Sequence, residues 1–597
     1  MTSENINLTE QLSPQFEGFF LKTSICKNSQ ELEERLDHHF SLELEVQPID
    51  SQSTSFDVGN QNLNLTAHEA WKLTYQIREL QDIAYVEPLF AISIDGRPDW
   101  TEEIVLPDEE QGVETFIQRI ASGSGSTEDL PESDDFEWAL TEMKVFEAWE
   151  RFFPDWETTP PGQGIIIGHP DTGYRLHPEI EDNLLLDKGY DFIDQDLDPL
   201  DTLEKPLGVL IPNPGHGTAA ASVIVSPKGG ASEPYITGVA PGATLIPYRT
   251  SSSVVLFRQS VKNLAQSIER AVQDGADIIS ASMGAVKPSR RLKEAVLQAQ
   301  AQGVIVLGAA GNIVPWVVPP ASIDEVIAVA GSNAKREIWT GSSFGKQVDV
   351  TAPGESVWMA RATKDDDGQV SFGVVRGSGT TFAVALTAGV AALWLAHHGG
   401  RKAIAQQLGG DDYLGQIPVL FKQILKKNCT SVPTWDPTKY GQGLVNAEDT
   451  IAANIEDYVD SVSMSDHSIS EFNVGAEDIL NEFQVLFEQA LPQVSPDISV
   501  SSEEGLTDKL TLQLSNLLNT SPKNLPEKLL DVGEELLFNF AVNPDSYKAF
   551  RRSLSESTFS SNRDEQSLLT KDNFDDIRAL LVSKGLSSKL RAQISRR

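Results

Sequence analysis

The first hundred residues alternate between short apolar runs and longer segments in which apolar residues recur every three or four positions. The apolar runs predict strands, and the longer segments predict helices. Each predicted helix has a capping residue at its start, Asn28 for the first and Thr66 for the second. The predicted strands are Phe19–Lys22, Leu42–Val46 and Ile83–Ile94, with room for one more between Val46 and Thr66, and the predicted helices are Ser29–His39 and Thr66–Leu80. This order predicts a small ferredoxin-like α+β domain over residues 1–95.

The pattern breaks between residues 96 and 134. This segment is rich in Asp and Glu and contains the stretch Gly123-Ser124-Gly125-Ser126. Such a composition is typical of an exposed linker, here with one short predicted helix over Val113–Ile120.

A different alternation follows over residues 135–453, where short apolar runs are separated by helical segments. The predicted strands include Ile165–Ile167, Leu245–Tyr248, Ile278–Ile279, Val304–Leu307 and Val326–Val329, and the helices between them include Val261–Gln273 and Arg291–Ala301. Strands that alternate with helices predict an α/β domain with a doubly wound parallel sheet. Ligands of such sheets bind at the carboxyl ends of the strands.

Strand patterns disappear over residues 454–597, which we interpret as a helical appendage. The predicted helices are Ala476–Leu491, Leu506–Leu518, Glu527–Val542 and Phe574–Ser583. The region contains no constellation of catalytic residue types. Its role stays open between a stabiliser, a linker and a docking module for a partner or substrate.

Composition excludes some classes of partner. The chain has 597 residues, enough for two to four domains, and carries 47 basic against 87 acidic residues, a net charge of −40. Because nucleic acids and anionic membrane surfaces are also negative, we expect neither as a partner. The longest apolar stretch, Phe382–Ala396, is too short to cross a bilayer comfortably, so we expect no membrane span.

The two cysteines, Cys26 and Cys429, lie far apart in the sequence. We therefore expect neither a disulfide framework nor a metal cluster built from cysteines. The first residues, MTSENINLTEQLSPQF, have no basic segment followed by an apolar one, as a secretory signal has. Together these features predict a cytoplasmic location.

Three side chains in the α/β region form a candidate catalytic set. Asp171 follows the apolar run that ends at Ile167, His216 opens a helical segment of small residues, and Thr381 opens another that runs to about Leu395. Acid, then histidine, then hydroxyl is one of the chain orders in which catalytic triads occur. A hydroxyl at a helix N-terminus lies at the positive end of the helix dipole, which favours developing negative charge.

At these motifs the chain resembles the subtilase family, the subtilisin-like serine proteases. The resemblance covers roughly Glu137 to Ala447 and more than half of the chain. The motifs that carry it are Asp171-Thr172-Gly173, His216-Gly217-Thr218, the run from Gly238 to Ala243, Ala309-Ala310-Gly311-Asn312, Ala352-Pro353-Gly354 and the run from Tyr440 to Ala447.

The resemblance implies a subtilisin-like fold and a role for each matching residue. His216 would act as the general base and acid, Asp171 would hold its tautomer, and the residue at 381 would be the nucleophile. Asn312 would donate to the oxyanion. The segment Ser282-Met283-Gly284 would pair with an extended substrate backbone. The N-terminal domain resembles the family's prosegment, which implies that it covers the cleft as an inhibitor until the acidic linker is cut.

The chain also departs from the family pattern. Thr381 stands where the family has serine, Ala385 where it has proline, and Ser222 where it has glycine, while Pro170 replaces an apolar strand residue. The β-methyl of threonine restricts its side-chain torsion and is able to turn the oxygen away from His216.

Two functions therefore stay open. One is an endopeptidase that hydrolyses protein or peptide substrates by acyl transfer and requires no cofactor. The other is an impaired pseudoprotease that binds peptides or a protein without cutting them.

The acidic run from Asp191 to Asp201 has carboxylates at alternating positions. Oxygen ligands spaced in this way are able to hold calcium. The alternative is a solvated acidic loop. No other metal site is predicted.

Overall fold

The computed structural model describes residues 13–24, 28–49, 54–59, 63–93, 135–204, 213–230, 235–256, 261–285, 289–312, 316–365, 367–459, 475–488, 503–556, 571–582 and 586–595. The chain forms two compact units, one from residues 1–105 and 470–597 and the other from residues 106–469. The helix predicted in the linker, over Val113–Ile120, lies outside the described residues. The predicted domain boundaries at residues 95, 134 and 453 stay predictions.

The N-terminal part of the first unit is the predicted α+β sandwich. Its elements are β1 (Ser13–Thr23), α1 (Ser29–Phe40), β2 (Glu45–Pro48), β3 (Ser55–Gly59), α2 (Ala67–Arg78) and β4 (Ile83–Ser93). The four strands form an antiparallel sheet in the order β2-β3-β1-β4, which is the split βαβ arrangement of ferredoxin-like domains. The expected extra strand is therefore β3.

One predicted strand begins later than its sequence pattern indicated. Leu42–Val46 alternates like a strand, but β2 begins only at Glu45. Ser41 ends α1 in the left-handed conformation, and the N–H of Leu44 donates to the Asp37 carboxylate at 2.8 Å. The residues between α1 and β2 are therefore held by the helix end and not by a strand partner.

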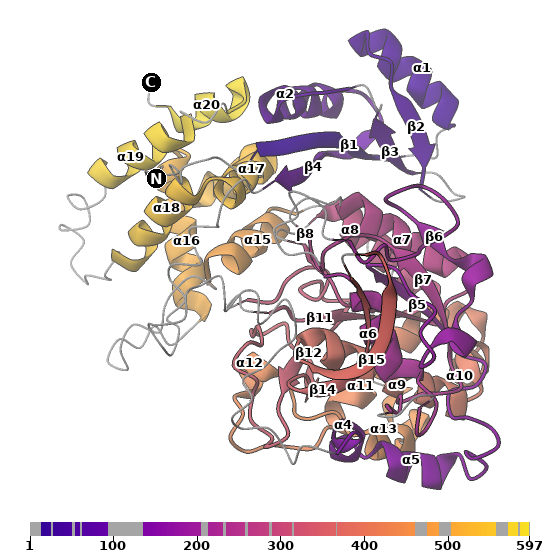
Figure 1. Ribbon diagram of the computed structural model, residues 1–597. Coiled ribbons are helices and arrows are strands. Elements are labelled where there is room, and N and C mark those ends of the chain that lie inside the picture. Colours follow the sequence, from indigo (N-terminus) through magenta and orange to yellow (C-terminus); the bar gives the residue numbers. More distant parts are fainter. Residues whose placement is uncertain are drawn as a thin grey trace, which may run out of the picture. The chain divides into compact units, whose positions relative to one another are not determined.

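The C-terminal helices pack against this sandwich and share a core with it. They are α15 (Ala476–Glu488), α16 (Glu503–Leu517), α17 (Leu525–Val542), α18 (Pro544–Glu556), α19 (Lys571–Val582) and α20 (Ser588–Ile594). The shared core joins Trp71, Tyr75 and Phe90 to apolar side chains of these helices. In Figure 1 α17 and α20 lie beside α2. The helical region predicted from the sequence is confirmed, with α18 and α20 added to the four helices expected.

Glu535 on α17 is a buried acid at the junction of these two segments. Its carboxylate accepts hydrogen bonds from the Tyr75 hydroxyl, at 2.9 Å, and from the N–H and hydroxyl of Ser587, at 2.8 and 2.6 Å. Burial raises the pKa of the Glu535 carboxyl, although these hydrogen bonds and nearby His68 oppose the shift. The neighbouring charges are the ion pair of Arg78 with Glu534, and Lys589, which stands over the Tyr75 ring.

The raised pKa predicts that this junction loosens as pH rises. Because the folded state holds the proton of Glu535 more tightly than the unfolded state, its stabilising effect is complete below about pH 4.5 and declines as pH rises through the folded pKa. We expect amide exchange in α17 and α20 to accelerate, beyond its intrinsic pH dependence, as pH rises above about 4.5. Glu535→Gln should remove that excess, as measured by hydrogen–deuterium exchange. An equal excess in the variant would assign it to another group.

The second unit is built on a seven-stranded sheet whose strands are all parallel. Its order is β13-β12-β11-β9-β5-β7-β6. The strands are β5 (Ile166–Asp171), β6 (Tyr190–Asp191), β7 (Thr244–Arg249), β9 (Ile278–Ala281), β11 (Ile305–Ala309), β12 (Ile327–Ser332) and β13 (Val350–Pro353). Later strands lie on both sides of β5, so the direction of strand addition reverses there. Binding sites of open α/β sheets lie at such a point, beyond the strand ends.

Helices cover both faces of this sheet, as the alternation of strands and helices predicted. They are α4 (Trp138–Glu142), α5 (Val145–Phe152), α6 (His216–Val225), α7 (Val261–Gln273), α8 (Arg290–Ala301), α9 (Thr380–His397), α10 (Gly400–Leu408), α11 (Ile417–Lys427), α12 (Pro437–Tyr440) and α13 (Ala447–Ala452). Successive strand residues face opposite cores: Leu245 packs with α6 and α9, whereas Ile246 packs with α7 and α8. The unit also has two small sheets, β8 (Val255–Leu256) with β10 (Gly284–Ala285) and β14 (Val357–Lys364) with β15 (Val370–Gly377).

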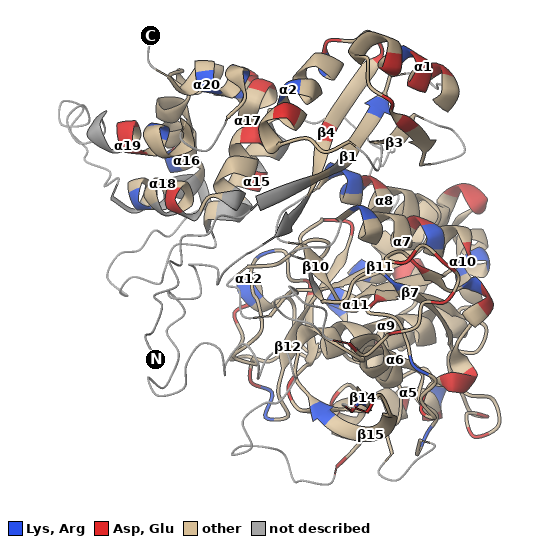
Figure 2. Ribbon diagram, turned by 45° about the horizontal axis from the view of Figure 1, so that its top comes forward, with Lys and Arg blue, Asp and Glu red and all other residues tan. Residues whose placement is uncertain are grey.

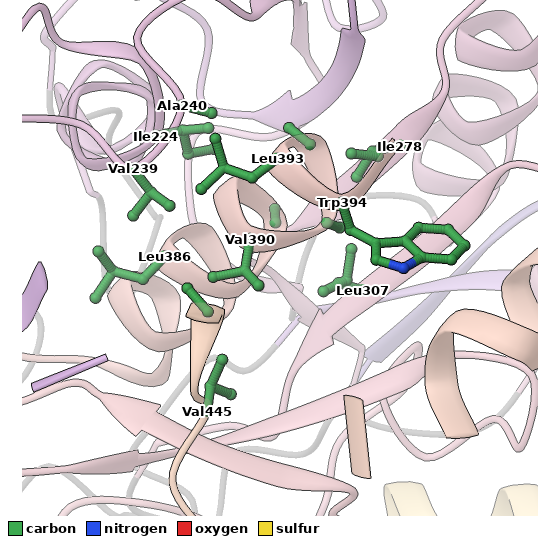
Figure 3. Close-up of a cluster of buried hydrophobic side chains, with 14 of the residues drawn as sticks. Ile224, Val239, Ala240, Ile278, Leu307, Leu386, Val390, Leu393, Trp394 and Val445 are labelled. Carbon is green, nitrogen blue, oxygen red and sulfur yellow. The ribbon is translucent and has the colours of Figure 1, made fainter. Parts of the chain in front are cut away.

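Helix α9 is the centre of the larger core. Leu386, Val390, Leu393 and Trp394 are fully buried among residues of α6 and the sheet (Figure 3). Among the described residues, α9 is the one helix long and apolar enough to span a membrane, but 89% of its 18-residue window is buried inside the fold. This burial is what the central helix of a folded core shows. Among the residues coloured by type in Figure 2, Asp and Glu occur in both units.

Candidate active site

The three predicted triad residues come from three separate elements of the second unit. Asp171 is the last residue of β5, His216 is the first residue of α6, and Thr381 lies in the first turn of α9. The carboxyl end of β5, where strand addition reverses, therefore lies close to the first residues of α6 and α9. The fold thus brings together side chains that are up to 210 positions apart in the sequence.

These side chains form a continuous hydrogen-bonded relay. The Nδ1 atom of His216 lies 2.7 Å from Asp171 Oδ1, and its Nε2 atom lies 3.1 Å from Thr381 Oγ1. Asp171 is fully buried, the His216 side chain is 13% exposed and Thr381 is 3% exposed. The methyl group of Thr381 therefore does not turn its oxygen away from the histidine.

The charge of Asp171 is held by its partners. Burial alone would raise the pKa of the Asp171 carboxyl, but the nearby His216 imidazole, its hydrogen bond and the Thr172 N–H lower that pKa below its usual value. Oδ1 accepts from Thr172 N as well as from His216, at 2.7 Å in each case. An ionised carboxylate bonded to Nδ1 fixes the tautomer in which Nε2 is free to accept a proton.

A second buried acid, Asp201, which the triad motifs did not reveal, bonds the backbone of Gly215 directly before His216. Asp201 Oδ2 accepts from Thr172 Oγ1 and from the N–H of Gly215, both at 2.8 Å. Burial raises the pKa of the Asp201 carboxyl, although its hydrogen bonds oppose the shift. Asp201 ends the acidic run, for which the sequence left a calcium loop and a solvated loop as alternatives; neither alternative includes a bond to Thr172 or Gly215.

Gly217, next to His216, must be glycine for the triad to assemble. A β-carbon there would lie 2.1 Å from the carbonyl oxygen of Gly173 and 3.2 Å from Asp171 Cβ. The two motifs thus approach each other more closely than any side chain allows.

Asn312 lies beyond β11, with its amide held beside the candidate nucleophile. Its Oδ1 atom accepts from both the N–H and the hydroxyl of Thr380, each at 2.9 Å, and Gly311 N–H donates to the Thr380 hydroxyl. With Oδ1 committed to acceptance, Nδ2 is turned toward the space beside Gly379. A β-carbon at 379 would lie 3.5 Å from Nδ2 and 3.6 Å from Thr381 Oγ1, so glycine leaves this space open. A donor that faces the nucleophile is what oxyanion binding requires.

The predicted substrate segment, Ser282-Met283-Gly284, lies next to the triad. Ser282 Oγ lies 3.5 Å from the carbonyl oxygen of Thr381, and the Met283 side chain is buried among α7 and α8. The N–H of Gly284 donates to the carbonyl oxygen of Val254 at 2.9 Å, directly before the residues of β8 that pair with β10. That N–H is therefore occupied within the chain, and the role of the segment in substrate binding stays a prediction.

Two departures from the family pattern have structural partners here. The hydroxyl of Ser222 donates to Ala219 O at 2.7 Å and accepts from Ala360 N at 2.9 Å, which ties α6 to β14. Ala385 is fully buried within the unbroken helix α9, where alanine keeps the N–H that proline lacks.

Removal of the Ser222 hydroxyl should destabilise the second unit. Ser222→Ala leaves the buried N–H of Ala360 without its acceptor, which should cost about 1–3 kcal/mol of unfolding free energy. Urea unfolding of the full chain measures the loss. Ser371→Ala, on the exposed face of β15, is the control and should cost less than about 0.5 kcal/mol. Equal losses in the two variants would contradict this account.

The acidic run from Asp191 to Asp201 is partly neutralised by the protein itself. Arg249 Nη1 bridges Asp191 Oδ2 and Asp194 Oδ2 at 2.6 and 2.5 Å, and Asp201 bonds Thr172. Within the described residues, no group of three or more His, Cys, Asp or Glu side chains could hold a metal ion. A calcium ion in this loop stays a prediction, and it would have to compete with Arg249 for two carboxylates.

Comparison with known proteins identifies the class that this fold and site define. The sequence model of the subtilase family matches residues 162–434. Subtilisin DY of Bacillus licheniformis is 30% identical over 241 residues, which cover 39% of this chain and 76% of that protein. The chain belongs to the subtilase family of serine proteases.

Other relatives extend this likeness over part of their length. The thermophilic serine proteinase of Bacillus sp. (strain AK1) is 31% identical over 207 residues, or 34% of this chain and 47% of that protein. The chain thus spans about half the length of this relative. Among solved structures, fervidolysin from Fervidobacterium pennivorans has a TM-score of 0.50 at 19% identity, over 75% of this chain and 62% of that one. The predicted subtilisin-like fold is confirmed.

The predicted cytoplasmic location is contradicted by the relatives. They include two minor extracellular proteases of Bacillus subtilis, Vpr and Epr, although the major intracellular serine protease of that organism also matches. The prediction failed because a small number of cysteines does not show whether a protein is cytoplasmic or secreted. A domain of this size buries enough apolar surface to be stable without disulfides.

Proposed function

We propose that the chain is an endopeptidase that hydrolyses peptide bonds by acyl transfer, with Thr381 as the nucleophile. The observation that carries the proposal is the relay from Asp171 through His216 to Thr381 Oγ1, with distances of 2.7 and 3.1 Å. Threonine hydroxyls serve as nucleophiles when a base lies within hydrogen-bond reach.

The proposed reaction has two halves. Thr381 Oγ1 attacks the carbonyl carbon of the substrate while His216 Nε2 takes the hydroxyl proton, and the carbonyl oxygen becomes an oxyanion that faces Asn312 Nδ2. The C–N bond then breaks as His216 returns the proton to the leaving amine, which leaves an ester on Thr381. Water repeats the sequence with the same base and releases the acid.

Each partner of the relay has a physical reason to act in this way. The carboxylate of Asp171 balances the positive charge that His216 gains in both halves, and its burial strengthens that interaction. Thr381 lies in the first turn of the 18-residue helix α9, whose dipole favours negative charge at the oxyanion. The mechanism needs no metal or cofactor.

The competing function is peptide binding without cleavage. One observation favours it: Thr381 is only 3% exposed, so its methyl group has little freedom to move away from an incoming carbonyl. A displacement of about 1 Å costs about 10²-fold in rate.

A serine-directed fluorophosphonate probe separates these functions. We expect the wild-type chain to be labelled slowly, Thr381→Ser to be labelled faster, and Thr381→Val, which keeps the shape but lacks the oxygen, to stay unlabelled. Labelling of the serine variant alone would support the binding function. If neither the wild-type chain nor Thr381→Ser is labelled, the acyl-transfer proposal fails. His216→Ala is the control and should abolish labelling in every background.

We further propose that the N-terminal sandwich inhibits the protease domain. The support is its ferredoxin-like topology, its place before that domain and its likeness to the family's prosegment. Peptidase assays on the protease domain, freed from the first unit by cleavage at both connections, test this role. Activity should rise on separation and fall again when the first unit is added back, and no change would refute inhibition.

A further inference from the structure

We propose that the C-terminal helices bind the N-terminal sandwich and retain it after the linker at residues 96–134 has been cut. Cleavage there would then leave a nicked protein in which the proposed inhibitor is still held. The consequence for regulation rests on the proposed inhibitory role, but the retention itself does not.

The first reason is that α2 has two apolar faces with different partners. Leu73 and Ile77 pack into the core beneath the sheet, together with residues of β1, β3 and α1. Ala70, Trp71 and Tyr75 instead belong to the core formed by the C-terminal helices. A helix that only covers one sheet needs a single apolar stripe, so the second face of α2 is built for the C-terminal segment.

The second reason is the aromatic packing across the junction. Phe538 of α17 is 2% exposed, and its ring centroid lies 4.6 Å from that of Phe90 and 6.0 Å from that of Trp71. Trp71 and Phe90 are 3% and 6% exposed in the assembled unit. Each such ring buries about 150–250 Å², so separation of the two segments would return a large apolar area to water.

The third reason is a set of polar contacts that ties the same two segments. Glu534 pairs with Arg78 and accepts from the Tyr85 hydroxyl at 2.7 Å. Near the N-terminal end of α2, the His68 imidazole bonds the carbonyl of Leu586 at 2.8 Å. Buried Glu535 accepts from Tyr75. Paired polar groups within an apolar interface fix one orientation, because any other leaves a buried charge without a partner.

The contacts join segments that precede and follow the protease domain in the sequence. A cut in the 96–134 linker breaks the covalent path between the sandwich and the protease domain, but it breaks none of these contacts. Release of the sandwich from the protease domain therefore requires a second event. Either the chain is cut between residues 460 and 474, or the sandwich separates from the C-terminal helices.

The test uses the full chain with two different inserted protease sites, one after Gly125 and one after Ser468. Thr381→Ala in the background prevents digestion by the protein itself. After both cuts, gel filtration separates what no longer binds. We expect the N-terminal and C-terminal fragments to elute in one peak. Separate elution of these two fragments would overturn the proposal.

A matched pair of variants on α2 shows which surface is responsible. Trp71→Ala removes a ring from the shared core and leaves Leu73 and Ile77 under the sheet, whereas Gln76→Ala changes an exposed position of the same helix. Trp71→Ala should weaken fragment association by about 10²-fold or more, and Gln76→Ala should leave it unchanged. Circular dichroism of the uncut chains checks that both variants are folded.

The outcomes separate this proposal from the inhibitory role. Co-elution that survives Trp71→Ala would mean that the fragments are joined by another surface, and the proposal would be wrong. Failure of retention leaves the inhibition assay valid, because that assay adds the first unit back to the freed protease domain. Conversely, retention without any effect on peptidase activity would keep this proposal and refute inhibition.

Discussion

Replacement of Asp171 by asparagine should lower kcat for peptide hydrolysis by about 10⁴-fold, the loss that the equivalent change causes in another serine protease triad. The carboxylate accepts from Nδ1 of His216 at 2.7 Å and holds the tautomer that leaves Nε2 free to take the Thr381 proton. An asparagine amide is able to donate to Nδ1 instead, which would place the imidazole proton on Nε2 and block that transfer.

Steady-state assays on the freed protease domain measure this effect. Asp198→Asn is a suitable control, because the Asp198 side chain is exposed and takes no part in the relay. The control should keep the wild-type kcat. If Asp171→Asn retained more than about a tenth of that rate, the relay would not be the catalytic device.

The second large effect is expected at Asn312. Asn312→Ala should reduce kcat by about 10²–10³-fold, the value associated with this type of donor in subtilisin, and should change KM little. The reason is that Nδ2 faces the space beside Thr381 Oγ1, where the oxyanion forms only in the transition state. If Asn312 bound the substrate and the transition state equally, its removal would raise KM and leave kcat unchanged.

Asn312→Asp is a sharper version of the same experiment. It keeps the shape and the acceptor for Thr380, but it replaces the donor Nδ2 with an oxygen. A variant as impaired as Asn312→Ala would assign the effect to the lost donor. Recovery of activity in Asn312→Asp would show that only the acceptor side of Asn312 matters.

Much of the site could be predicted from the sequence because its motifs are short and strongly constrained. The pair His216-Gly217 is one example. A β-carbon at position 217 would lie 2.1 Å from the carbonyl oxygen of Gly173, so only glycine fits there. Asp171 and Thr381 could be placed because a buried strand and a helix start have clear local patterns.

Other parts depend on partners that local patterns do not contain. Ser222 looked like a departure from the family, but its hydroxyl has two backbone partners, one of them on β14. The hairpin of β14 and β15 was not predicted, because β15 has only one buried residue and therefore no continuous buried apolar run. The acidic run that ends at Asp201 left calcium binding and a solvated loop open, and only the fold shows that Asp201 bonds Thr172 and Gly215.

The packing of the N-terminal sandwich against the C-terminal helices has a signal in the sequence of α2. In the segment Ala67–Arg78, Trp71 and Tyr75 form one pair at helical spacing and Leu73 and Ile77 form another. A single covered face would need only one of these pairs. The excess predicts a second partner, but only the structure shows that this partner is the C-terminal helices.

The shared core also has a consequence for the order in which the protein is made. Tyr75 and Glu535 bond each other across 460 positions of the chain. At about 5–20 residues per second, the ribosome adds Glu535 about 25–90 s after Tyr75. The protease domain is synthesised entirely within that interval. The sandwich can form its own sheet core early, but the first unit is complete only after the last helices emerge, so every molecule passes through a stage with a finished protease domain and a half-built neighbour.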